Sequence, residues 1–103
     1  MKRIAFDFDD TIVHDGTDKP ISNEMIEFIK QLKSHKDFQL IIETANPDLE
    51  HVYTTLKKLG IEPDIVTNTK QSVDIRIDDR CIRFNGDVEQ LKRDILNFKH
   101  WKT

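Results

Sequence analysis

Apolar residues follow two patterns along this chain: short continuous runs, and stripes that recur at the spacing of a helix. The runs predict strands over residues 2–8, 38–43, 65–67 and 73–77, with a further short strand over 82–84. The first run does not alternate with polar residues, which is typical of a central strand covered on both faces. The stripes between and after these runs predict three helices.

Capping residues mark the ends of the predicted helices. Ser22 is a suitable N-cap for the first helix, and Asp87 for the last. The middle helix is predicted to have Asn46 as its N-cap, Pro47 at its first position and Gly60 after its end. The apolar stripe of the last helix consists of Val88, Leu91, Ile95 and Phe98.

The alternation of strands and helices predicts an α/β fold: a three-layer, Rossmann-like parallel sheet with helices on both faces. The length of 103 residues predicts a single domain over residues 1–103. One connection is unusual, because only residues 68–72 separate the third and fourth strands, whereas parallel strands usually need about a dozen residues or more. Either the third strand is vestigial, or the chain reaches the fourth by an unusually short route.

The first predicted strand ends in acid, with Asp7 and Asp9 two positions apart. On an extended strand these two side chains point the same way. Two carboxylates at the end of a buried strand are costly unless a cation offsets them, and oxygen ligands suit Mg²⁺. A solvated acidic turn is the simpler interpretation of these residues taken alone.

Polar residues also follow the later strands. Thr44 follows the second strand, Lys70 the third, and the pair Asp78 and Asp79 the fourth. The carboxyl ends of parallel strands meet at one edge of the sheet, where ligands bind, so a single site is predicted there. Taken alone, Thr44 would cap the next turn and Lys70 would be a surface residue. A Lys70 at the start of the fourth strand would also lie far from this edge.

Together these residues resemble the four motifs of the haloacid dehalogenase superfamily of phosphohydrolases. The run Asp7-Phe8-Asp9-Asp10-Thr11 fits the first motif, Asp-x-Asp-x-Thr, in full. Thr44, Lys70 and Asp78-Asp79 match the strand-end hydroxyl, the lysine and the acidic pair. The resemblance covers about residues 2–80.

Two details refine the resemblance. The ending Asp78-Asp79-Arg80 is similar to that of small, capless members found in bacteria and phages, which implies a minimal core with an open site. The family usually has glycine where Asp10 stands, and glycine there permits a tight turn. Asp10 is therefore expected either to strain the loop or to add a carboxylate on the metal side.

The resemblance implies a role for each residue. Asp7 would be the nucleophile that forms an aspartyl-phosphate, and Asp9 would protonate the leaving oxygen and then activate water. Thr44 would hydrogen-bond a phosphoryl oxygen. Lys70 would neutralise the phosphoryl charge, with Arg80 as the alternative cation.

The resemblance also implies a Mg²⁺ cofactor. Its ligands would be Asp7, the backbone carbonyl of Asp9, and Asp78, while Asp79 would bind directly or through water. None of the four histidines, His100 included, has metal-ligand spacing, and His100 is expected to be solvated.

The implied function is a Mg²⁺-dependent phosphomonoester phosphatase that acts through an aspartyl-phosphate. The alternatives are a nucleic-acid end phosphatase and a non-catalytic phosphate-binding or interaction module on the same fold. The expected partner is a phosphorylated small molecule or polymer end, and a homo-oligomer could cover an open site.

Composition narrows the setting. A formal charge of −3 and the lack of a long basic run argue against a strong nucleic-acid footprint. No apolar run approaches the roughly 18 residues that a membrane span needs. Cys81 is the single cysteine, so an intrachain disulfide is excluded, which fits a reducing cytoplasm.

Overall fold

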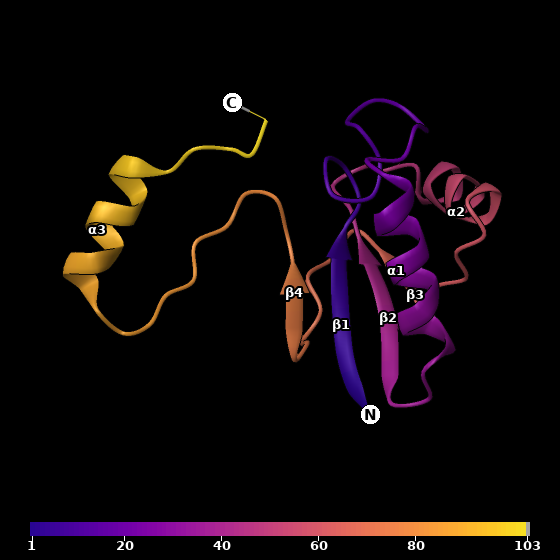
Figure 1. The fold of residues 1–103 in the computed structure, drawn as a ribbon, viewed down its shortest axis with the longest axis horizontal. Coiled ribbons are helices and arrows are strands. Elements are labelled where there is room, and N and C mark those ends of the chain that lie inside the picture. Colours follow the sequence, from indigo (N-terminus) through magenta and orange to yellow (C-terminus); the bar gives the residue numbers. More distant parts are fainter. Residues whose placement is uncertain (103) are drawn as a thin grey trace.

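The computed structural model describes residues 1–102 and shows a four-stranded parallel sheet with strand order β3-β2-β1-β4 (Figure 1). The central strand β1 (Lys2–Asp7) pairs with β2 (Phe38–Glu43) on one side and β4 (Ile75–Ile77) on the other, and β3 (Ile65–Thr67) lies beyond β2. The predicted α/β, Rossmann-like parallel sheet is therefore confirmed. Strand β1 ends one residue earlier than predicted, at Asp7.

Helices α1 (Asn23–Ser34) and α2 (Leu49–Lys58) pack on one face of the sheet and form the core with it. Alternate residues of a strand share a face, so Ile4 and Phe6 of β1 lie on this side. They belong to one buried cluster with residues from β2 and from both helices, namely Leu40, Ile42, Ile26, Ile29, Val52 and Leu56. Both helices therefore cover the same face, and the described residues do not form the predicted helix layer on the other face.

The second face of the sheet carries a polar network in place of a packed helix. Arg76 of β4 donates through Nε to Glu43 Oε1 at 2.8 Å, and Arg3 Nε donates to Gln39 Oε1 at 2.8 Å. These residues sit over Ala5 and Ile41, both of which are fully buried. The long side chains thus cover small and apolar residues, as amphipathic stems commonly do.

The short connection between β3 and β4 runs across this second face. Gln71 N donates to Glu43 at the carboxyl edge, 2.7 Å away, and Asp74 N donates to the Arg3 carbonyl near the amino edge, 2.9 Å away. Midway, Arg3 Nη1 donates to the carbonyl of Ser72 at 2.5 Å. Residues 68–74 therefore cross the sheet directly, which is the short route that the sequence left open.

Local capping explains where the helices begin and end. Met25 N donates to Ser22 Oγ at 3.1 Å, which confirms Ser22 as the N-cap of α1. The prediction of Asn46 as the N-cap of α2 is wrong, because Asp48 takes that place and accepts from His51 N at 3.1 Å. Asn46 instead accepts from Asp48 N, an Asx-turn that precedes the cap.

The region after β4 departs from the sheet. Residues 82–84 form no strand, so that prediction is wrong. Helix α3 (Val88–Asn97) is capped by Asp87 as predicted, but none of its residues is buried. Figure 1 shows α3 well away from the sheet, within the segment of residues 80–99, which is called the arm from here on. No helix in the described chain combines the length and apolar character needed to cross a membrane.

Candidate active site

The carboxyl edge of the sheet gathers three acids from two neighbouring strands. Strands β1 and β4 are parallel, and Phe6 pairs with Ile77, so the residues after them leave the sheet side by side. The result is a cluster in which carboxylate oxygens of Asp7, Asp78 and Asp79 all lie within 4.8 Å of one another. Three hard oxygen donors at this spacing could hold a divalent cation such as Mg²⁺.

The cluster strongly changes the acidity of Asp7. Burial, the hydrogen bond with Asp79 and the nearby charges of Asp78, Asp79 and Asp9 together raise the pKa of Asp7 to about 8. Burial also acts to raise the pKa of Asp79, but hydrogen bonds with Asp7 and His100 outweigh it and leave that pKa below its usual value. The shared hydrogen bond therefore shifts the two pKa values in opposite directions, up for Asp7 and down for Asp79.

Asp9 lies in the turn after β1 and faces Thr44 at the end of β2. Thr44 Oγ1 donates to Asp9 Oδ2 at 3.4 Å and accepts from Asn46 N at 3.1 Å. The hydroxyl thus caps the following turn and also contacts an acid of the site. Burial, followed by the charge of Asp15, raises the pKa of Asp9, although the hydrogen bond with Thr44 partly opposes this.

Two cations border the acids. Lys70 lines the same pocket as Asp7 and Thr44, because it follows β3 at the carboxyl edge before the chain crosses the second face. The concern that it would lie too far away is therefore removed. Arg80 lines a neighbouring pocket with Asp7 and Asp9, and its Nε lies 3.5 Å from Asp79 Oδ2.

Asp10 occupies a backbone conformation that favours glycine. Its φ is +61°, and it is the one non-glycine residue in the described chain with a positive φ. Aspartate tolerates this region better than most residues. The side chain pairs with Lys102 and accepts from Asp15 N at 2.9 Å, and these contacts lower the pKa of Asp10.

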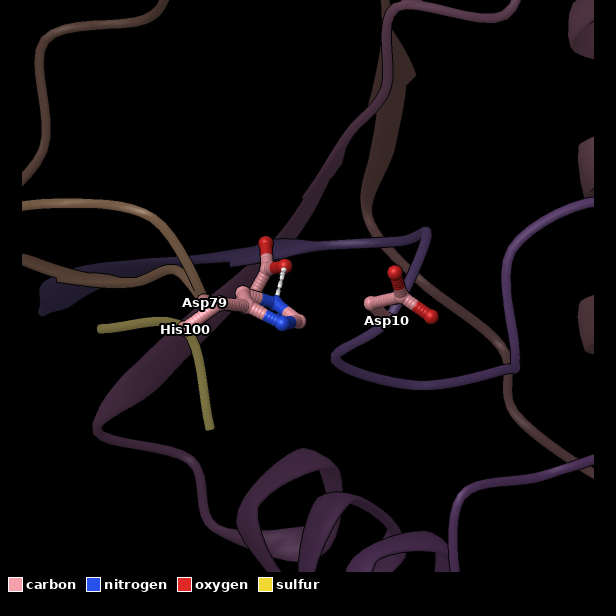
Figure 2. Close-up of side chains that lie close together, drawn as sticks. All are labelled: Asp10, Asp79 and His100. Atoms are coloured by element: carbon pink, nitrogen blue, oxygen red, sulfur yellow. Dashed lines mark hydrogen bonds and ion pairs between the residues drawn. The ribbon is translucent and has the colours of Figure 1, made fainter. Parts of the chain in front are cut away.

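Residues 100–102, called the clasp from here on, complete the site. His100 Nε2 lies 2.5 Å from Asp79 Oδ2, Trp101 Nε1 donates to the Asp10 carbonyl at 3.1 Å, and Lys102 Nζ pairs with the Asp10 carboxylate. Figure 2 shows the imidazole between Asp79 and the Asp10 loop. The expectation of a solvated His100 is wrong, because its exposed fraction is 9 %.

The clasp is not predicted from the sequence, because no local pattern indicates a contact between Asp10 and Trp101, which are 91 positions apart. The one signal was charge: the run from Lys99 to Lys102 is basic, and the predicted site is acidic. Charge alone could not specify which acid His100 would contact.

Comparison with known proteins tests the family assignment. A family model described as haloacid dehalogenase-like hydrolase matches residues 4–93, which include the acids from both strands as well as Thr44 and Lys70. No curated protein and no solved structure matches the chain. The matched region contains all of the sheet except the first two residues of β1, and it spans well over half of the chain. The chain therefore belongs to the haloacid dehalogenase-like hydrolase family.

Proposed function

We propose that this hydrolase is a Mg²⁺-dependent phosphomonoester phosphatase that acts through an aspartyl-phosphate. The observation that carries the proposal is the meeting of Asp7 with Asp78 and Asp79 within 4.8 Å, in a pocket that Asp7 shares with Thr44 and Lys70. Phosphoryl transfer depends mainly on positioned charge, and this edge of the sheet supplies acids and cations together.

The donor set fits a hard divalent cation. Asp7, Asp78 and Asp79 would hold Mg²⁺, with the Asp9 carbonyl as a further ligand. When bound, the cation supplies positive charge that lowers the pKa of Asp7 and offsets the phosphoryl oxygens. The raised pKa of Asp7 supports this assignment, because burial and the neighbouring negative charges both disfavour the ionised carboxylate, which a bound cation would stabilise.

Asp7 and Asp9 of the first motif have different roles in this proposed reaction. The ionised Asp7 carboxylate attacks phosphorus, an acyl-phosphate bond forms, and the bond to the leaving oxygen breaks. Asp9 gives its proton to that oxygen and then takes a proton from the water that cleaves the acyl-phosphate. A raised pKa suits Asp9 to this role, since a general acid works best when its pKa is near the working pH.

The surroundings of the acids support an open site. Between β1 and α1 the chain makes a loop in which Val13 bridges to Asp9 and Pro20, with no additional helix or longer strand. Thr44 and Lys70 would bind the phosphoryl oxygens from the β2 and β3 side. A site without a covering domain suits a bulky substrate, so a phosphorylated polymer end belongs in the substrate panel beside small phosphomonoesters.

Release of inorganic phosphate from an aryl phosphate tests the proposal. We expect turnover with Mg²⁺ and none with EDTA, and Asp7→Asn should reduce turnover by about 10³-fold or more, as loss of a covalent nucleophile does. Asp37→Asn is the matched control, because Asp37 is an exposed acid just before β2, at the opposite edge of the sheet.

Two results would contradict the proposal. Full activity in Asp7→Asn would exclude Asp7 as the nucleophile. A wild-type protein that binds inorganic phosphate but hydrolyses neither the aryl phosphate nor an oligonucleotide with a terminal phosphate would favour the non-catalytic module.

A further inference from the structure

The clasp is held from both sides of the site. His100 contacts Asp79, which follows β4, while Trp101 and Lys102 contact Asp10 in the loop after β1. The contact with Asp79 is well shielded from water, since the exposed fractions of the two side chains are 8 % for His100 and 6 % for Asp79. Three consecutive residues of the clasp thus connect the acidic segment after β4, through Asp79, with the loop after β1, through Asp10.

The geometry defines the tautomer of His100. The backbone N–H of Lys102 donates to His100 Nδ1 at 3.3 Å, so Nδ1 acts as an acceptor. In a neutral imidazole the hydrogen is then on Nε2, which points to Asp79 Oδ2 at 2.5 Å. His100 therefore donates to the carboxylate, and the clasp backbone itself selects the nitrogen that does so.

The hydrogen bond constrains one oxygen of Asp79. His100 and Arg80 both approach Oδ2, at 2.5 Å and 3.5 Å. These contacts fix the rotation of the carboxylate without using Oδ1. A carboxylate oriented in this way can present its other oxygen to a cation held between Asp7 and Asp78.

A second interpretation of the same residues is a separate metal site, since ligand atoms of Asp10, Asp79 and His100 lie within 4.8 Å of one another. The contacts argue against it. Both nitrogens of His100 are engaged in hydrogen bonds, and the Asp10 carboxylate is paired with Lys102. The ammonium of Lys102 would also repel a cation at this place.

We propose that the clasp orders the late acidic pair for metal binding, with His100 as a positioning residue that orients the Asp79 carboxylate. The inference rests on the proposed function, because it concerns the support of one of the same metal ligands. Carboxylates that bind metals are commonly held by a further hydrogen-bonding partner, and loss of that partner typically costs about 10- to 100-fold in metal affinity or activity.

Calorimetric titration of the full chain with Mg²⁺, without substrate, tests this role. We expect His100→Ala to weaken Mg²⁺ binding about 10- to 100-fold. His100→Gln should restore binding to within a few-fold, because its amide nitrogen lies near the position of Nε2. His100→Asn should not, because its shorter side chain places the amide near Nδ1. His51→Ala is the control, since His51 is an exposed histidine on α2.

The outcomes separate this inference from the proposed function. Unchanged Mg²⁺ affinity in a folded His100→Ala protein would overturn the role of the clasp and leave the phosphatase proposal standing. If the alanine variant does not fold, equal affinities of His100→Gln and His100→Asn would overturn it instead. A wild-type protein that binds Mg²⁺ but hydrolyses no phosphomonoester would overturn the phosphatase proposal alone, and one that does not bind Mg²⁺ would overturn both.

Discussion

The sheet with α1 and α2 and the arm of residues 80–99 have similar sequence patterns and very different surroundings. Both contain helices with an N-cap and an apolar stripe. In the described chain, however, every buried apolar residue lies at or before Ile61, and the stripe of α3 is exposed along most of its length. An amphipathic pattern therefore predicts that a helix forms but does not say what the helix packs against.

The arm is nevertheless tied to the sheet at both ends. It begins directly after the acidic pair that follows β4, and it ends in the clasp. The site lies where these two tethers meet. The comparison shows that packing and contact with the acids are separate: the buried apolar residues lie in the sheet and its two helices, whereas the clasp that contacts Asp79 and Asp10 follows the arm.

The sharpest test of the comparison is a matched pair of isoleucines in helices. Ile29 of α1 is fully buried, whereas 59 % of Ile95 of α3 is exposed. We expect Ile29→Ala to lower the free energy of unfolding by about 2–5 kcal/mol, and Ile95→Ala to change it by less than about 0.5 kcal/mol. Urea unfolding followed by circular dichroism measures both. Comparable losses would mean that α3 is covered in solution.

Asp7 should make the free energy of unfolding depend on pH. The pKa of Asp7 is about 8 in the folded protein, against an ordinary value of 3.8 for an aspartate in an unfolded chain, so its contribution to stability is complete below about pH 4. As the pH rises above about 4, Asp7 of the unfolded chain loses its proton while Asp7 of the folded protein keeps it. The stabilisation of the folded protein by protonated Asp7 therefore decreases progressively up to about pH 8. The pKa of Asp79 is lowered, so Asp79 titrates below this range.

Asp7→Asn removes this dependence. In EDTA, we expect the free energy of unfolding of the wild type to fall between pH 5 and pH 8 by about 1–2 kcal/mol more than that of the variant, after allowance for solvent screening. Urea titrations at four pH values provide the measurement. Parallel pH profiles for the two proteins would show that Asp7 ionises normally.

The smallest expected effect concerns the helix caps. Ser22 and Asp87 make equivalent hydrogen bonds to the third residue of α1 and α3. Ser22→Ala should lower the global free energy of unfolding by about 1 kcal/mol. Asp87→Ala should leave it nearly unchanged and instead increase amide hydrogen exchange within α3. A shared global loss would indicate that the arm unfolds together with the sheet.

Much of the sheet could be predicted from sequence because its determinants are local. The unbroken run at Ile4 to Phe6 indicated a central strand, and the strand-end acids indicated the edge where the site lies. The sequence predicts Asn46 as the N-cap of α2, whereas the structure has Asp48 in that place. Both residue types are good N-caps, and the path of the backbone decides between them. The roles of Asp7, Asp9, Thr44 and Lys70 stay predictions.

Contacts between distant segments could not be predicted in the same way. The crossing of residues 68–74 depends on Arg3 and Glu43, which lie far away in the sequence. The clasp depends on a separation that is longer still. A pattern of hydrophobicity carries no information on such pairings, since it specifies which face of an element is buried but not its partner.

The placement of β4 beside β1 also bears on the order in which the molecule assembles. Strand β1 can pair with β2 once residue 43 has been synthesised. Its other edge can pair with β4 only after Ile75 has been synthesised, 71 positions after Ile4, with which Ile75 pairs. Closing the longer loop costs more entropy, so this pairing is expected late in folding. Until then the chain has its apolar core and Asp7 but lacks Asp78, Asp79 and the clasp. A nascent or partly folded molecule is therefore compact before its acids come together, and the candidate site forms only when β4 pairs with β1.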